Sequence, residues 1–125
     1  MAHAESVRLP ATADIWLSDA NASERNTSMG AAPRLKLKAH QELSAIRFDA
    51  GSIKGREVKS GRLWIRKAGE DKLRYLRVST INQDWNEGRS ERSYGPADGA
   101  TWLYADSNNK KSWGWPGSGF CDVIM

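Results

Sequence analysis

Short runs in which apolar and polar residues alternate recur along the first 80 positions of this 125-residue chain. Side chains of a strand point alternately to opposite faces, so this period of two predicts antiparallel strands with one buried face. No window shows a sustained helical period with capping residues at its ends. The pattern predicts an all-β fold whose strands are Ala13 to Ser18, Arg34 to Lys38, Leu43 to Asp49, Gly61 to Lys67, Leu73 to Thr80 and Phe120 to Met125.

The length is that of one ordinary domain, so we expect a single β-sandwich over residues 1–125. Two segments, Ser18 to Pro33 and Gly88 to Gly119, have the Gly, Asn and Ser content of long loops. Long loops in a small domain are typically functional or disordered. The second segment is too aromatic for disorder, since it holds Tyr94, Trp102, Tyr104, Trp113 and Trp115.

The net charge of +4 and the pI near 9.4 favour an anionic partner. The 15 acidic residues are scattered among the 19 basic ones, and no zinc-ligand spacing, RNA-binding octapeptide or helix-turn-helix pattern is present. We therefore expect no nucleic-acid partner. No apolar run is long enough for a membrane span, and residues 1–10 lack a signal-peptide core. Cys121 is the sole cysteine, so no internal disulfide forms.

Histidine-based catalysis is not expected, because His3 lies near the terminus and His40 beside a polar turn. Asp84 and Glu87 are the most suggestive carboxylate pair for glycoside cleavage. Their spacing of three within a turn favours a structural role in that turn. No set of Tyr, His, Lys or Arg at lyase spacing is evident. The sequence predicts a protein that binds a ligand and is not an enzyme.

Tryptophan is abundant, with six residues in the chain. The apolar face of a sugar ring packs on an indole ring, while charged neighbours bind its hydroxyl and carboxylate groups. In Arg62 to Arg66, Trp64 falls between the two arginines and opposite Leu63 and Ile65. The alternative is that a second layer covers this face and Trp64 is packed in a core. The remaining candidate ligand-binding residues are Trp16, Trp85, Trp102, Trp113 and Trp115.

Five blocks in order resemble the DNRLRE, or disaggregatase-related, family of carbohydrate-binding modules; they are Leu9 to Trp16, Asn26 to Lys38, Ala45 to Ile53, Val58 to Ile65 and Leu76 to Gly88. The family is known for a jelly-roll β-sandwich appended to secreted polysaccharide-degrading enzymes and surface proteins. Some members bind acidic polysaccharides such as alginate. The resemblance implies an antiparallel jelly roll and a secreted, extracellular location.

The match weakens after Gly88, and family members continue for several strands beyond the equivalent of Cys121 to Met125. A truncated or shortened sandwich is therefore expected, and its open sheet edge would favour self-association. Jelly-roll carbohydrate modules often hold a structural calcium ion, which carboxylates near the chain ends would bind. The candidate ligands are Asp14, Asp49 and Asp122.

These observations lead to one hypothesis and two rivals. The leading hypothesis is a non-catalytic module that binds polysaccharide, with acidic polysaccharide favoured. The first rival is a structural or adhesive module that binds protein through the same exposed aromatic side chains. The second is a small polysaccharide lyase or hydrolase.

Overall fold

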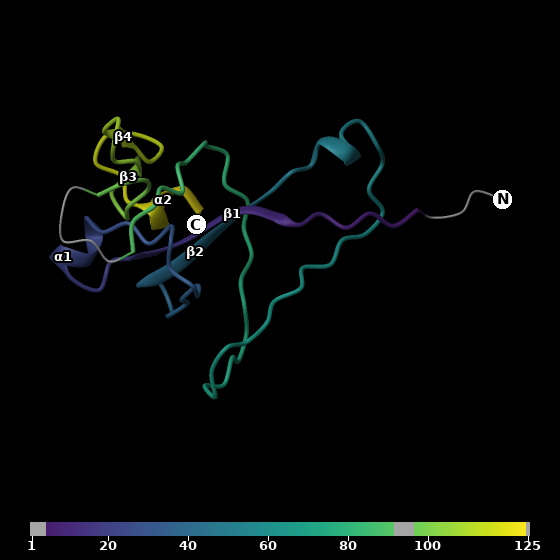
Figure 1. The fold of residues 1–125 in the computed structure, drawn as a ribbon, viewed down its shortest axis with the longest axis horizontal. Helices are drawn as coiled ribbons and strands as arrows, with labels where there is room; N and C mark the ends of the chain where they lie inside the picture. The colour runs from purple at the N-terminus through teal and green to yellow at the C-terminus, as the bar shows by residue number, and fades with distance from the viewer. Residues whose placement is uncertain (1–4, 92–96, 125) are drawn as a thin grey trace.

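Two small antiparallel sheets and three short helical segments make up the regular structure of the computed structural model, which describes residues 5–91 and 97–124 (Figure 1). The described chain is thus mostly non-helical, as the alternation predicts. None of its helices is long or apolar enough to cross a membrane. The elements are β1 (Ala11–Ser18), α1 (Ala22–Arg25), β2 (Glu42–Phe48), the 3-10 helix η1 (Gly51–Ile53), β3 (Tyr104–Asp106), β4 (Lys111–Ser112) and α2 (Phe120–Ile124).

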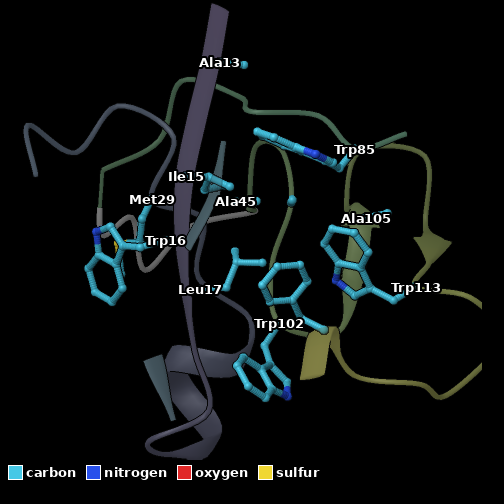
Figure 2. Packing of buried hydrophobic residues seen from close by; sticks show 12 residues of the cluster. Ala13, Ile15, Trp16, Leu17, Met29, Ala45, Trp85, Trp102, Ala105 and Trp113 are labelled. Atoms are coloured by element: carbon cyan, nitrogen blue, oxygen red, sulfur yellow. The ribbon is translucent and has the colours of Figure 1, made fainter. Parts of the chain in front are cut away.

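Strands β1 and β2 form the larger sheet and confirm the predicted faces of this hairpin. Ile15 lies opposite Ala45 and Leu17 lies opposite Leu43 in the register. Ile15 and Leu17 are fully buried on one face. Trp16 lies on the other side of the strand, next to Met29 (Figure 2). Both faces of β1 are therefore covered at this point.

The second layer of the core comes from the irregular C-terminal region. Trp113 and Phe120 are fully buried, and their ring centroids lie 4.7 Å apart. The indole Nε1 of Trp113 donates a hydrogen bond of 2.8 Å to the carbonyl oxygen of Thr101. Trp102 meets Phe120 edge to face at 6.2 Å (Figure 2). A region predicted as a loop thus supplies much of the hydrophobic core.

The turn after Trp85 is fastened to β1 and to a neighbouring loop. Glu87 Oε1 accepts a hydrogen bond of 2.8 Å from the backbone N–H of Asp14. Gly88 has a φ of 70°, and a Cβ there would lie 2.0 Å from the carbonyl oxygen of Asp98. Only glycine suits a left-handed position with so close a backbone neighbour. This turn is therefore a structural joint of the fold.

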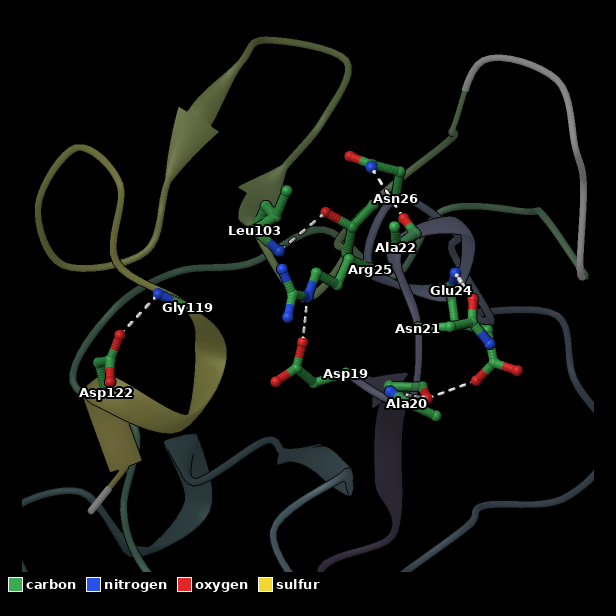
Figure 3. A network of polar contacts seen from close by, with 12 residues as sticks. Asp19, Ala20, Asn21, Ala22, Glu24, Arg25, Asn26, Leu103, Gly119 and Asp122 are labelled. Atoms are coloured by element: carbon green, nitrogen blue, oxygen red, sulfur yellow. Dashed lines mark hydrogen bonds and ion pairs between the residues drawn. The ribbon is translucent and has the colours of Figure 1, made fainter.

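Polar contacts organise the end of the molecule at α1 and α2 (Figure 3). Asn21 caps α1, since its Oδ1 accepts a hydrogen bond of 2.9 Å from the N–H of Glu24. Asp19 forms an ion pair with Arg25. Asp122 Oδ2 accepts a hydrogen bond of 2.9 Å from the N–H of Gly119, directly before α2.

Four of the six predicted strands are wrong as strands. Arg34 to Lys38 makes a single bridge, from Lys38 to Glu42, because its leucines lie exposed and meet no second strand. Phe120 to Ile124 forms the helix α2, with Phe120 buried, and Met125 lies outside the described residues. Gly61 to Lys67 and Leu73 to Thr80 have no strand partner among the described residues.

These last two segments belong to a projection that we call the arm, residues 55–82. Its first leg (57–68) and second leg (72–82) meet at a turn far from both sheets (Figure 1). Residues 57–82 form no backbone–backbone hydrogen bond with any described residue. Without a ladder partner an extended segment is not a strand, however regular its alternation. We call residues 11–48 and 83–124 the body.

Candidate functional site

Large apolar side chains of the described chain are exposed mostly in the arm. Trp64 is 85% exposed and Tyr75 is 81% exposed. Eight of the thirteen exposed large hydrophobic side chains lie there, whereas the body buries most of its own. A soluble protein rarely leaves such a concentration of apolar surface uncovered unless it meets a partner. The arm is therefore the candidate site.

Alternation sorts the side chains of each leg into two rows. In extended backbone, residues two apart lie on the same side. We call Arg62, Trp64 and Arg66 of the first leg, with Tyr75 and Arg77 of the second, the aromatic-basic row. We call the opposite residues the aliphatic row; they are Leu63, Ile65, Leu76 and Val78. One row combines flat rings with guanidinium groups, and the other is apolar without rings.

The two rows would each be continuous if the legs paired across their turn. Lys67 Nζ donates a hydrogen bond of 2.9 Å to the carbonyl oxygen of Asp71 at this turn. Placing Lys67 opposite Lys72 would set Trp64 opposite Tyr75. The same register would set Leu63 opposite Leu76. The sequence thus encodes a hairpin with an aromatic-basic face and an aliphatic face.

The positive charge of the protein resides in the arm. Residues 55–82 hold eight Lys and Arg but three Asp and Glu, a net charge of +5. The rest of the chain holds eleven basic and twelve acidic residues, a net charge of −1. Clustered charge of one sign raises the local concentration of oppositely charged ligands. The arm is therefore the part of the molecule suited to an anionic ligand.

Three of the predicted ligand-binding residues, Arg62, Trp64 and Arg66, are exposed together on the arm. Trp115 is 60% exposed but lies between β4 and α2 and shares no row with them. Sequence reasoning missed Tyr75. The signal was available, because Tyr75 stands between Arg74 and Arg77 in a leg that alternates like the first.

The other four predicted tryptophans belong to the core, and their assignment to a binding surface is corrected. Their exposed fractions are 3% for Trp16, 7% for Trp85, 6% for Trp102 and 0% for Trp113. Lys36 Nζ lies 4.5 Å from the ring centroid of Trp16. The guanidinium of Arg47 lies 4.7 Å from that of Trp85. Protein cations and apolar neighbours already occupy these ring faces.

The three candidate calcium ligands lie on different parts of the fold and form no common site. Asp14 is on β1, Asp49 follows β2 and Asp122 is in α2. Asp49 Oδ1 accepts a hydrogen bond of 2.9 Å from the N–H of Gly51. Within residues 5–91 and 97–124, no three His, Cys, Asp or Glu side chains gather closely enough to hold a metal. Calcium binding stays a prediction without an assembled ligand set.

The carboxylates considered for glycoside cleavage have structural surroundings. Asp84 is exposed, whereas Glu87 is bound to the backbone of β1. Partial burial, with a smaller contribution from the negative charge of Glu87, raises the pKa of the Asp14 carboxyl above its usual value. The contact between Asp14 and Glu87 follows from the turn that joins them, which accounts for both groups without a substrate.

An open hollow of about 300 Å³ lies beside α2, where His40, Cys121 and Asp122 are among its lining residues. Burial, followed by the nearby carboxylates of Asp122 and Asp19, raises the pKa of the Cys121 thiol. A protonated thiol is a weak nucleophile and a weak metal ligand. Asp19 is paired with Arg25, and Asp122 is bound to Gly119. The hollow therefore lacks the free reactive groups of an active site.

Comparisons with protein-family models, with curated proteins and with solved structures found no match. The resemblance to the DNRLRE family therefore stays a prediction that rests on the order of its sequence blocks. Geometry and charge are the grounds on which a function is proposed.

Proposed function

We propose that this protein is a non-catalytic carbohydrate-binding module that holds an acidic polysaccharide against the aromatic-basic row of the arm. One observation carries the proposal. The ring of Trp64 is 85% exposed between two arginines, in a segment of net charge +5. The ring faces needed for stacking and the cations needed for carboxylates are thus present together.

The chemistry of the row suits a polymer of acidic sugars. An indole or phenol ring stacks on the C–H face of a pyranose, which contributes about 0.5 to 1.5 kcal/mol per contact beyond area burial. Exposed ion pairs between arginine and carboxylate contribute about 0.2 to 1 kcal/mol each. These small terms predict modest affinity for one sugar and useful retention only along several adjacent sugars.

The finer fold assignment belongs to the same proposal. In a jelly-roll sandwich the two legs of the arm would serve as strands, and their regular alternation with unpaired backbone supports that role. The secreted, extracellular setting and the structural calcium ion that the resemblance implies are part of this proposal as well.

The test is affinity electrophoresis of the full chain in native gels that contain alginate, with dextran gels as the neutral counterpart. We expect alginate to retard the protein and 1 M salt to weaken the retardation, because the Debye length falls to about 3 Å at that strength. Trp64→Ala should weaken the apparent dissociation constant by about threefold to tenfold, the loss of one stacking contact. Trp115→Ala is the matched control, because it removes a tryptophan that is also exposed but lies outside the arm.

Three outcomes would contradict the proposal. Equal retardation in dextran and alginate at every salt concentration would remove its electrostatic part. Release of unsaturated or reducing sugar during incubation would show a lyase or a hydrolase. A lack of retardation by any polysaccharide would leave protein recognition as the function of the exposed aromatic side chains.

A further inference from the structure

The aliphatic row is a second unpartnered surface, which polysaccharide binding does not explain. Leu63 and Ile65 are 44% and 52% exposed, and Leu76 and Val78 are 37% and 68% exposed. Branched aliphatic side chains offer no flat face for a sugar ring. Their burial is favourable mainly against other apolar protein surface. This row therefore calls for a protein partner, on the side of the arm opposite to Trp64.

The backbone of the arm and one edge of the larger sheet lack partners in the same chain. Residues 57–82 form no backbone–backbone hydrogen bond with any described residue. Strand β2 pairs with β1 on one side and with no further strand of the described chain on its other side. An open edge presents N–H and C=O groups to which another extended segment adds readily. Every copy of the protein thus carries both an unpaired segment and an edge that could receive it.

Charge decides between two ways in which two copies could meet. Arm against arm would bring together two segments of net charge +5 each. The rest of the chain has a net charge of −1, and residues 83–125 alone hold six acidic and four basic residues. Opposite potentials favour association and like potentials oppose it. The arm of one copy is therefore matched to the body of another copy.

We propose that the protein forms a dimer by exchange of arms, in which a leg of each arm adds to the free edge of β2 in the other copy. The aliphatic row then packs on the partner, while the aromatic-basic row stays open. Closed two-fold exchange is the common form of such a swap. The 24 exposed residues from 57 to 80 match the number that one side of a standard interface supplies, which is about 20 to 30.

The first test measures the mass of the full chain by sedimentation velocity and light scattering over a wide range of concentration. We expect a dimer at high concentration and its dissociation on dilution. Val78→Lys should raise the dimer dissociation constant at least tenfold, because a charge replaces an aliphatic side chain at the interface. Leu73→Lys is the matched control on the same leg, with 56% exposure and the opposite parity. It should leave the dimer unchanged.

A second measurement separates the proposed dimer from other contacts. Hydrogen exchange should show amides of residues 57–80 becoming protected as the dimer forms. Carbodiimide crosslinking of mixed light and heavy copies should join arm lysines of one copy to body carboxylates of the other. A monomer at every concentration would overturn the proposal, as would crosslinks between arms alone or equal effects of the two substitutions. Polysaccharide binding is tested separately, since Trp64→Ala alters the other row.

Discussion

The body and the arm use the same kinds of residues to opposite ends. In the body, Trp113 is fully buried between Phe120 and the backbone of Thr101. In the arm, Trp64 projects from an extended segment and is 85% exposed. The difference lies in what covers the residue, because the body brings distant segments together and the arm meets none of them. A tryptophan in an alternating segment is thus structural or available according to its long-range neighbours.

The largest expected effect is on the free energy of unfolding when each tryptophan is truncated in turn. Trp113→Ala should lower it by about 3 to 5 kcal/mol, because a large cavity opens in the core. Trp64→Ala should change it by less than about 0.5 kcal/mol, since an exposed residue leaves no cavity. Urea denaturation monitored by circular dichroism measures both values. A comparable loss at Trp64 would mean that the arm is packed and that the comparison fails.

Glycine substitution gives an intermediate effect. Gly88→Ala should destabilise the body by at least about 1 to 2 kcal/mol, the cost of a left-handed conformation for an L residue, with a further cost from the contact with Asp98. At Gly61 in the arm, an added Cβ would meet no atom within 4 Å. Gly61→Ala should therefore be neutral or slightly stabilising in the same denaturation experiment. Equal losses at the two sites would show that the arm is as closely packed as the body.

The smallest effect concerns pH and the joint between β1 and the turn at Glu87. The pKa of Asp14 is raised in the folded protein, mainly by burial and then by Glu87. The folded state therefore holds this proton more tightly than the unfolded state, and stability falls as pH rises from the unfolded pKa through the folded one. Asp14→Asn should flatten this part of the stability profile. Thermal unfolding at several pH values above 4 would show it.

Asp49→Asn, also a substitution of a single carboxylate, is the control for that profile. Asp49 lies beyond β2 and binds the backbone of Gly51, away from the joint. An unchanged slope in Asp14→Asn, or the same flattening in Asp49→Asn, would show that contact with Glu87 does not govern the titration.

Sequence alternation was sufficient to predict β1 and β2, because each has a clear apolar face and the other strand as its partner. It was not sufficient for the legs of the arm, whose alternation is equally regular, because period alone does not reveal whether a neighbouring strand exists. The helix at Phe120 was also missed. Phe120, Val123 and Ile124 have the spacing of one helical turn, but five residues are too few to establish a helical period.

The candidate site was predicted in its centre and not in its extent. Trp16 and Trp64 look alike in the sequence, since each lies opposite two aliphatic residues in an alternating run. What separates them is Met29 and Lys36, which cover Trp16 from segments remote in the chain. The loop tryptophans Trp102 and Trp113 entered the core for the same reason, because the C-terminal region folds over β1.

The exposure of Trp64 makes the arm visible to fluorescence. Four of the six tryptophans are buried, so their emission should be shifted to the blue and shielded from dissolved quenchers. Trp64 and Trp115 are the two exposed tryptophans, and of these Trp64 stands in a field of net positive charge. Iodide accumulates near such charge and caesium is repelled. The ratio of quenching by these two ions therefore reports on the surroundings of one side chain in the intact protein.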